Sequence, residues 1–217
     1  MQATISQESL ADKAYAVVEE MIVTLALPPG QVFSEAELSQ QIDIGRTPLR
    51  EALQRLAADR LVTALPRKGV MVTEINVAEH LKLLETRRVL DRLIATRAAR
   101  RATPDQRAAL QEGAQAIEQA ATEDDLAAFM RLDRAGDALL ESASRNPFAT
   151  NAAEPLHTHC RRFWYRYRHD GDLTQSAALH ASMLRDVAAG DEAQAAVASD
   201  ALIDYLETFT RATVDLF

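Results

Sequence analysis

Residues 45–56 read GRTPLREALQRL and have the pattern of a short helix with one apolar face. Thr47 is a good N-cap and Pro48 suits the first helical position, so we expect the helix to begin there. It should run to about Asp59. The apolar residues that it should bury are Leu49, Ala52, Leu53 and Leu56.

Two helices precede this stretch and a hairpin follows it. The expected elements, in chain order, are helices over 10–25, 35–41 and 47–59 and strands over 61–65 and 70–75. Ser34 and Glu37 have capping-box spacing, which predicts the start of the second helix. The turn over 66–69 joins two segments rich in β-branched residues, which predicts a β-hairpin. This order predicts an N-terminal winged helix-turn-helix: three helices plus a β-hairpin wing.

The charge of this region contrasts with that of the whole chain. The chain has 24 Lys and Arg against 32 Asp and Glu, a net charge of −8 that argues against nucleic acid. Between Arg46 and Lys68, however, six basic residues face two acidic ones, a local balance of +4. Arg46 and Arg50 are four residues apart and share a helix face, where arginine can bind a guanine edge or a phosphate. The local charge therefore favours DNA binding.

Three segments resemble GntR-type bacterial transcription regulators: residues 45–56, LPPGQVFSE at 27–35 and RKGVMV at 67–72. The resemblance covers about residues 10–75. It implies DNA contacts by Arg46, Thr47, Arg50 and Gly69, and we add Lys68 and Ser34 as candidates. Gly45 and Ala36 stand where the family often has a hydroxyl residue and an arginine.

The sequence of residues 77–217 predicts an all-α helical bundle. This bundle is a domain separate from the DNA-binding domain expected over residues 1–76. Its expected helices lie at about 77–102, 104–121, 123–144, 147–169, 173–189 and 191–215. The apolar side of the first of these helices should consist of Leu81, Leu84, Val89, Leu93 and Ala98–Ala99. The bundle resembles the FCD class of ligand-binding domains in the FadR branch of the same family. The fold class is therefore mainly α, and the bundle should bind an effector and dimerise.

The FCD resemblance also implies a divalent metal held by one Asp and three His. The matching positions here are Asp133, Asp137, His180 and Leu202. Asp137 puts a carboxylate where imidazole is usual, and Leu202 cannot ligate. A reduced site of Asp133, Asp137 and His180 could still hold Zn, Ni or Mn. The alternative is that Asp137 faces solvent and His180 is a hydrogen-bonded pocket residue.

Residues 157–169, HTHCRRFWYRYRH, combine basic and aromatic side chains. This segment is either a core helix whose arginines reach toward solvent or one wall of an effector pocket, in which an arginine binds a carboxylate. The candidate effector-binding residues are Arg87, Asp133, Asp137, His180, Arg161 and Trp164. His157 and His159 are two residues apart, so we expect packed polar histidines and not a shared site.

The sequence is less consistent with a secreted protein, a membrane protein or an enzyme. Residues 1–10 carry no signal-peptide pattern, no apolar run is long enough to span a membrane, and a single Cys160 excludes an internal disulfide, so we expect a cytoplasmic protein. No catalytic motif is present, so we expect no enzyme.

We therefore expect a DNA-binding repressor that binds a palindromic operator in double-stranded DNA as a homodimer and responds to a small-molecule carboxylate. One alternative is a helical metal- or ligand-dependent enzyme with a vestigial winged helix. Another is a purely structural dimer module.

Overall fold

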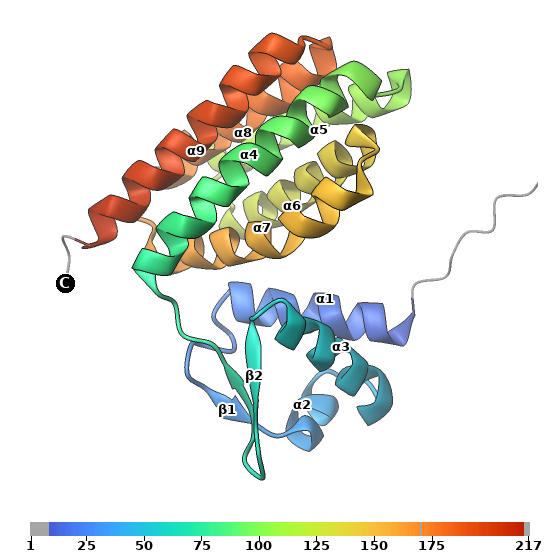
Figure 1. Ribbon diagram of the computed structural model, residues 1–217, viewed down its shortest axis with the longest axis vertical. Helices are drawn as coiled ribbons and strands as arrows, with labels where there is room; N and C mark the ends of the chain where they lie inside the picture. Colours follow the sequence, from blue (N-terminus) through green and yellow to red (C-terminus); the bar gives the residue numbers. More distant parts are fainter. Residues whose placement is uncertain (1–8, 170, 215–217) are drawn as a thin grey trace, which may run out of the picture. The chain divides into compact units, whose positions relative to one another are not determined.

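The computed structural model describes residues 9–169 and 171–214, which fall into two compact units. One lies within Met1–Ile75 together with Arg162–Arg166, and the other lies within Asn76–Arg161 and Tyr167–Phe217. The fold is mainly α, with a small antiparallel sheet in the first unit (Figure 1). This confirms the predicted fold class. Within the described residues, no helix combines the length and the apolar composition that a membrane span requires.

The first unit has the predicted order of elements. They are α1 (Leu10–Val23), β1 (Val32–Phe33), α2 (Glu35–Gln41), α3 (Arg46–Ala58), β2 (Val62–Leu65) and β3 (Gly69–Val72). The apolar side chains predicted for α3 are buried and join one hydrophobic core with α1 and the sheet. The core holds α3 against the rest of the unit, so its polar face is left exposed.

The first unit also contains a strand that the sequence did not predict. β1 pairs antiparallel with β3, with Phe33 opposite Val70, and the strand order is β1-β3-β2. Two residues are too short for an alternating pattern to show. β1 leads directly into α2, so this pairing ties the start of α2 to the hairpin.

The predicted start of α3 is wrong by two residues. Gly45 is the N-cap, α3 begins at Arg46, and Thr47 is not the capping residue. Pro48 takes the third helical position, which it tolerates because its missing N–H has no partner in the first turn in any case. The amide of Leu49 then donates to the carbonyl of Gly45 at 3.2 Å.

Beyond residue 76 the chain forms the six predicted helices, with ends shifted by a few residues. They are α4 (Val77–Arg101), α5 (Pro104–Thr122), α6 (Leu126–Ser144), α7 (Pro147–Tyr167), α8 (Asp172–Ala189) and α9 (Glu192–Val214). α4 packs against α9 and α6, α5 packs against α8 and α6, and α8 also packs against α9 (Figure 1).

The buried side of α4 differs from the predicted apolar side. Val89 is 69% exposed, whereas Arg87 and Asp91 are buried. Leu84 and Ala98–Ala99 are buried as expected. Buried charges cost free energy unless they are paired, so their position points to partners within the bundle.

Candidate functional site

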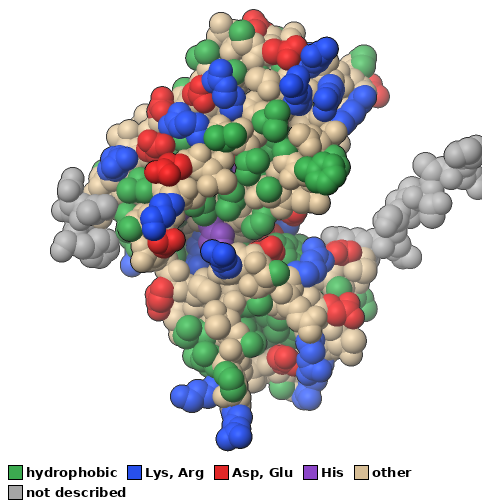
Figure 2. Space-filling model, in the orientation of Figure 1, with side chains coloured by type: hydrophobic (Ala, Val, Ile, Leu, Met, Phe, Trp, Pro, Cys, Tyr) green, Lys and Arg blue, Asp and Glu red, His purple; other side chains and the backbone are tan. Residues whose placement is uncertain are grey.

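The first unit has a groove between the start of α2, the start of α3 and the hairpin. Its volume is about 530 Å³, and its lining residues are Ser34, Glu35, Ala36, Arg46, Ala64, Leu65, Arg67, Lys68, Gly69 and Val70. Four predicted DNA contacts, Ser34, Arg46, Lys68 and Gly69, therefore lie on one groove. Figure 2 shows Lys and Arg side chains at the tip of the hairpin. The groove is thus flanked by positive charge from two sides.

The N-terminus of α3 opens beside this groove. Its N-cap residue, Gly45, makes no side-chain cap hydrogen bond, so the first turn of α3 lacks the acceptor that an N-cap side chain usually supplies to its amides. Thr47 is exposed in this first turn. An uncapped helix N-terminus attracts phosphate through its amides and its dipole. The arrangement suits a DNA backbone, with Thr47 and Arg46 placed to add side-chain contacts.

Arg50 is held by a carboxylate from α2. Its Nη2 donates to Oε2 of Glu35 at 2.7 Å and its Nε donates to the same atom at 3.1 Å. The Arg50 guanidinium also holds the pKa of the Glu35 carboxyl below its usual range. The Arg50 side chain remains 61% exposed, so the pair orients the guanidinium without hiding it from DNA.

Two predicted contacts also have roles within the fold. Ser34 N-caps α2: its Oγ accepts from the Glu37 amide at 3.1 Å and donates to Oε2 of Glu37 at 2.8 Å. Gly69 has φ +110°, and a Cβ there would lie 2.3 Å from the carbonyl oxygen of Phe33. Only glycine therefore allows β3 to pair with β1 at this point.

Replacing Gly69 with alanine is expected to lower the free energy of unfolding of the first unit by about 1–3 kcal/mol, because the new Cβ meets backbone and the φ is strained. Chemical denaturation followed by circular dichroism measures this. Lys68→Ala, at an adjacent exposed position, serves as the control and should leave stability unchanged. A Gly69→Ala protein as stable as the control would contradict the pairing of β1 with β3.

The second unit buries a group of charged side chains, which we call the polar cluster. Its members are Arg87 and Asp91 of α4, Asp133, Asp137 and Glu141 of α6, His157 and Arg161 of α7, and His180 of α8. Arg87 Nη2 lies 2.7 Å from Asp91 Oδ2, and the other Asp91 oxygen accepts from His157 Nε2 at 2.8 Å. Asp91 thus joins α4 to α7.

The other half of the cluster is centred on Arg161. Its Nη1 donates to Oδ2 of Asp137 at 2.8 Å and lies 4.0 Å from Oδ2 of Asp133. Asp133 in turn has its Oδ1 atom 3.1 Å from Nδ1 of His180. Asp137 does not face solvent, because its side chain is 13% exposed. The structure therefore brings together five of the six predicted effector residues.

The sixth predicted effector residue is not among them. Trp164 is buried, but it lies in the Arg162–Arg166 stretch that is grouped with the first unit. Conversely, the cluster contains Asp91, Glu141 and His157, which were not predicted from the sequence as effector-binding residues. The sequence does carry a signal for these three residues. They lie four residues from Arg87, Asp137 and Arg161, respectively, on the same helix, and residues at that spacing share a helix face.

His157 carries a positive charge at neutral pH. Burial opposes protonation, but the charges of Asp137 and Asp91 outweigh it and raise the pKa of His157 to about 10. Burial likewise opposes ionisation of Asp91, yet Arg87 and His157 lower the pKa of Asp91 to about 2. The expectation that His157 is simply a packed polar residue therefore misses its charge.

The protonated His157 should make stability depend on alkaline pH. Its pKa is about 10 when folded and near the ordinary 6.5 when unfolded, so its contribution is complete below pH 6.5 and is lost as the pH rises toward 10. Between pH 7 and 10 the unfolding midpoint should fall by about 4 °C or more. His157→Gln, measured over the same range, should show a flatter dependence. Parallel curves for the two proteins would contradict a charged His157.

The residues present do not fit a divalent metal. Asp137 is engaged by the Arg161 guanidinium, and Leu202 at the fourth implied position is a fully buried apolar residue. Among residues 9–169 and 171–214, no group of three or more His, Cys, Asp or Glu side chains is arranged to hold an ion. Asp133 and His180 alone supply too few ligands for zinc, whose structural and catalytic sites use at least three protein ligands.

Two polar atoms of the cluster are nevertheless left over. Asp133 Oδ1 and His157 Nδ1 are buried and make no hydrogen bond of good geometry to a described residue, although His180 Nδ1 lies 3.1 Å from Asp133 Oδ1. His157 Nδ1 lies 3.4 Å from Asp137 Oδ2 and 3.3 Å from Glu141 Oε1. Such atoms are costly unless a ligand or water satisfies them. The cluster can therefore offer one acceptor and one donor to a bound molecule.

Comparison with known proteins identifies both parts of the chain. Residues 10–72 match the family model described as bacterial regulatory proteins, gntR family, and residues 82–205 match the FCD domain. A fatty acid metabolism regulator protein from Erwinia tasmaniensis is 31% identical over 183 residues, covering 74% of this chain and 75% of that protein. The matched families are regulatory ones, which argues against the alternative of an enzyme.

Other relatives match over shorter segments or by fold alone. An uncharacterized HTH-type transcriptional regulator from Agrobacterium vitis is 32% identical over 44% of this chain, and the chain spans only 56% of that relative. The solved structure of E. coli McbR/YncC superimposes with a TM-score of 0.83 at 19% identity, over 96% of this chain and 100% of that one. The chain belongs to the GntR family of bacterial transcription regulators, in the FadR branch that carries an FCD domain.

Proposed function

We propose that this chain is a ligand-responsive repressor that binds a palindromic operator in double-stranded DNA as a homodimer. Residues 1–76 would bind DNA, and residues 77–217 would bind the effector and dimerise. The observation that carries the proposal is the uncapped N-terminus of α3 beside a groove lined by Arg46, Arg67 and Lys68. Amides and basic side chains together can hold phosphates while the face of α3 reads bases.

A fluorescence-anisotropy titration with DNA from upstream of its own gene tests the proposal. We expect specific binding that weakens steeply with salt and is strongest for two half-sites about one helical turn apart. The −8 net charge of the chain should keep binding to unrelated DNA weak. Equal affinity for unrelated DNA, or none for either, would refute the proposal.

The polar cluster is the proposed effector site, and its effector is a small organic acid. Arg161 is the cation best placed to bind a ligand carboxylate, but Asp137 already pairs with it at 2.8 Å. A ligand would therefore bind by exchange. Asp137 could then form its hydrogen bond with Nδ1 of His157 instead, which lies 3.4 Å away and makes no hydrogen bond of good geometry, so that neither carboxylate is left buried without a cation.

A screen of small carboxylic acids tests this second part. The active acid should raise the unfolding temperature of the protein and change its affinity for the operator. The amide of the same acid serves as the control and should do neither, because it cannot replace the Asp137 carboxylate. If uncharged compounds bind and acids do not, the effector class is wrong while the DNA-binding proposal stands.

A further inference from the structure

The polar cluster contains an internal cation at the point where the FCD resemblance implies a metal ion. Two of the implied ligand residues, Asp133 and Asp137, approach the Arg161 guanidinium, at 4.0 Å and 2.8 Å from Nη1. Nη2 of Arg161 donates to Thr158 Oγ1 at 3.1 Å, which fixes the side chain on its own helix. The Arg161 guanidinium is therefore a buried group that is held in place by partners within the helical bundle.

The remaining implied positions are consistent with this arrangement. Leu202 of α9 has an apolar side chain that is 1% exposed, so the fourth implied position supplies no ligand. His180 keeps its Nδ1 atom near Asp133. A divalent ion placed between Asp133 and Asp137 would stand next to a guanidinium that cannot lose its proton, and the two cations would repel each other.

We infer that Arg161 replaces the metal ion as the cation of this effector site, so that the chain binds its effector without a divalent metal. The inference rests on the proposed function only in taking the polar cluster as the effector site. Arg161 is then a ligand-binding residue that meets the effector carboxylate directly, through paired hydrogen bonds of the kind guanidinium makes with carboxylate.

The first test uses the wild-type chain, purified without chelators. Elemental analysis should find Zn, Ni and Mn near zero per chain, and neither EDTA nor addition of these ions should move the unfolding temperature. A near-stoichiometric ion whose removal by EDTA lowers the unfolding temperature would overturn the inference. Because both readouts are independent of DNA and effector, failure here can be told apart from failure of the proposed function.

The second test restores the implied ligand set in the variant R161M/D137H/L202H. Removing the internal cation and supplying two imidazoles should create metal dependence, so saturating Zn or Ni should raise the unfolding temperature by about 5 °C or more. D137H/L202H, which keeps Arg161, is the matched control and should respond much less. An equal response of the two variants would show that Arg161 does not exclude the ion. Should the triple variant not fold, the wild-type measurements decide alone.

Discussion

Replacing Arg50 with alanine is expected to weaken specific operator binding by about 5- to 150-fold per half-site, the effect of losing one bidentate base contact worth about 1–3 kcal/mol. The fold should be intact, because Arg50 is mostly exposed and its pair with Glu35 lies at the surface. In a homodimer both half-sites lose the contact, so the effect on the full operator is larger. Anisotropy titrations with operator and with unrelated DNA measure it.

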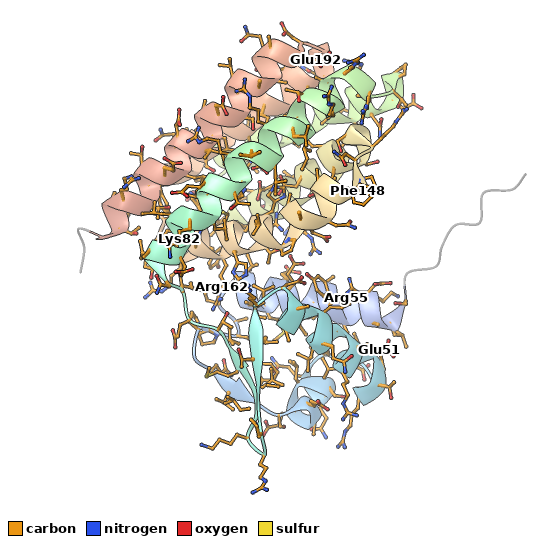
Figure 3. The ribbon with its side chains drawn as sticks, viewed as in Figure 1. Glu51, Arg55, Lys82, Phe148, Arg162 and Glu192 are labelled. Atoms are coloured by element: carbon orange, nitrogen blue, oxygen red, sulfur yellow. The ribbon has the colours of Figure 1, made fainter. Side chains whose placement is uncertain are left out.

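Arg55→Ala is the matched control for this prediction. Arg55 lies on the same helix (Figure 3) and carries the same charge, but it packs over the Tyr15 ring at 4.3 Å and pairs with Asp12 of α1 at 2.7 Å. Its loss should reduce binding to both DNAs slightly and equally. If Arg55→Ala impairs operator binding as much as Arg50→Ala, the effect of Arg50 is one of bulk charge, and the proposed base contact is wrong.

Replacing Arg161 with methionine is expected to destabilise the second unit by about 3–5 kcal/mol, the usual cost of leaving a buried carboxylate without its cation. Methionine keeps most of the side-chain length, so the loss reports on charge more than on volume. The loss corresponds to a fall of roughly 6–20 °C in the unfolding temperature for a protein of this size. Urea denaturation followed by circular dichroism gives the free energy of unfolding.

Two controls separate the charge effect from general damage. Arg185→Met removes a pair with Glu118 whose side chains are each more than one third exposed, and should cost about 1 kcal/mol or less. R161M/D137N also neutralises the stranded carboxylate and should recover part of the lost stability. A double variant no more stable than R161M would show that Asp137 is not the group that Arg161 compensates.

Much of the first unit could be predicted because its signals are local. The Ser34–Glu37 capping box, the 3–4 spacing of apolar residues in α3 and the turn before Gly69 each act within a few residues. The predictions for this unit were wrong or incomplete where two local signals compete or where no local signal exists. Thr47 and Gly45 can both precede a helix that contains Pro48, and two-residue β1 exists only because β3 lies beside it.

Most of the pairing within the polar cluster could not be predicted, because its signals are not local in the sequence. Arg87 and Asp91 interrupt the apolar side of α4, so periodicity assigned that side to Val89 instead. Their burial becomes favourable only when His157 of another helix completes the network. Likewise, nothing near Asp137 in the sequence indicates that its partner is Arg161, 24 residues away.

The amino-acid sequence was therefore sufficient for the order of helices, the winged helix-turn-helix, the basic character of α3 and the family to which the chain belongs. These follow from backbone preferences and apolar periodicity, which act over short distances along the chain. Tertiary structure alone showed which charges neutralise one another: Glu35 with Arg50, Asp91 with His157, and Arg161 with Asp137. The reason is that the cost of a buried charge depends on what lies within a few ångströms of it, and those neighbours come from other helices.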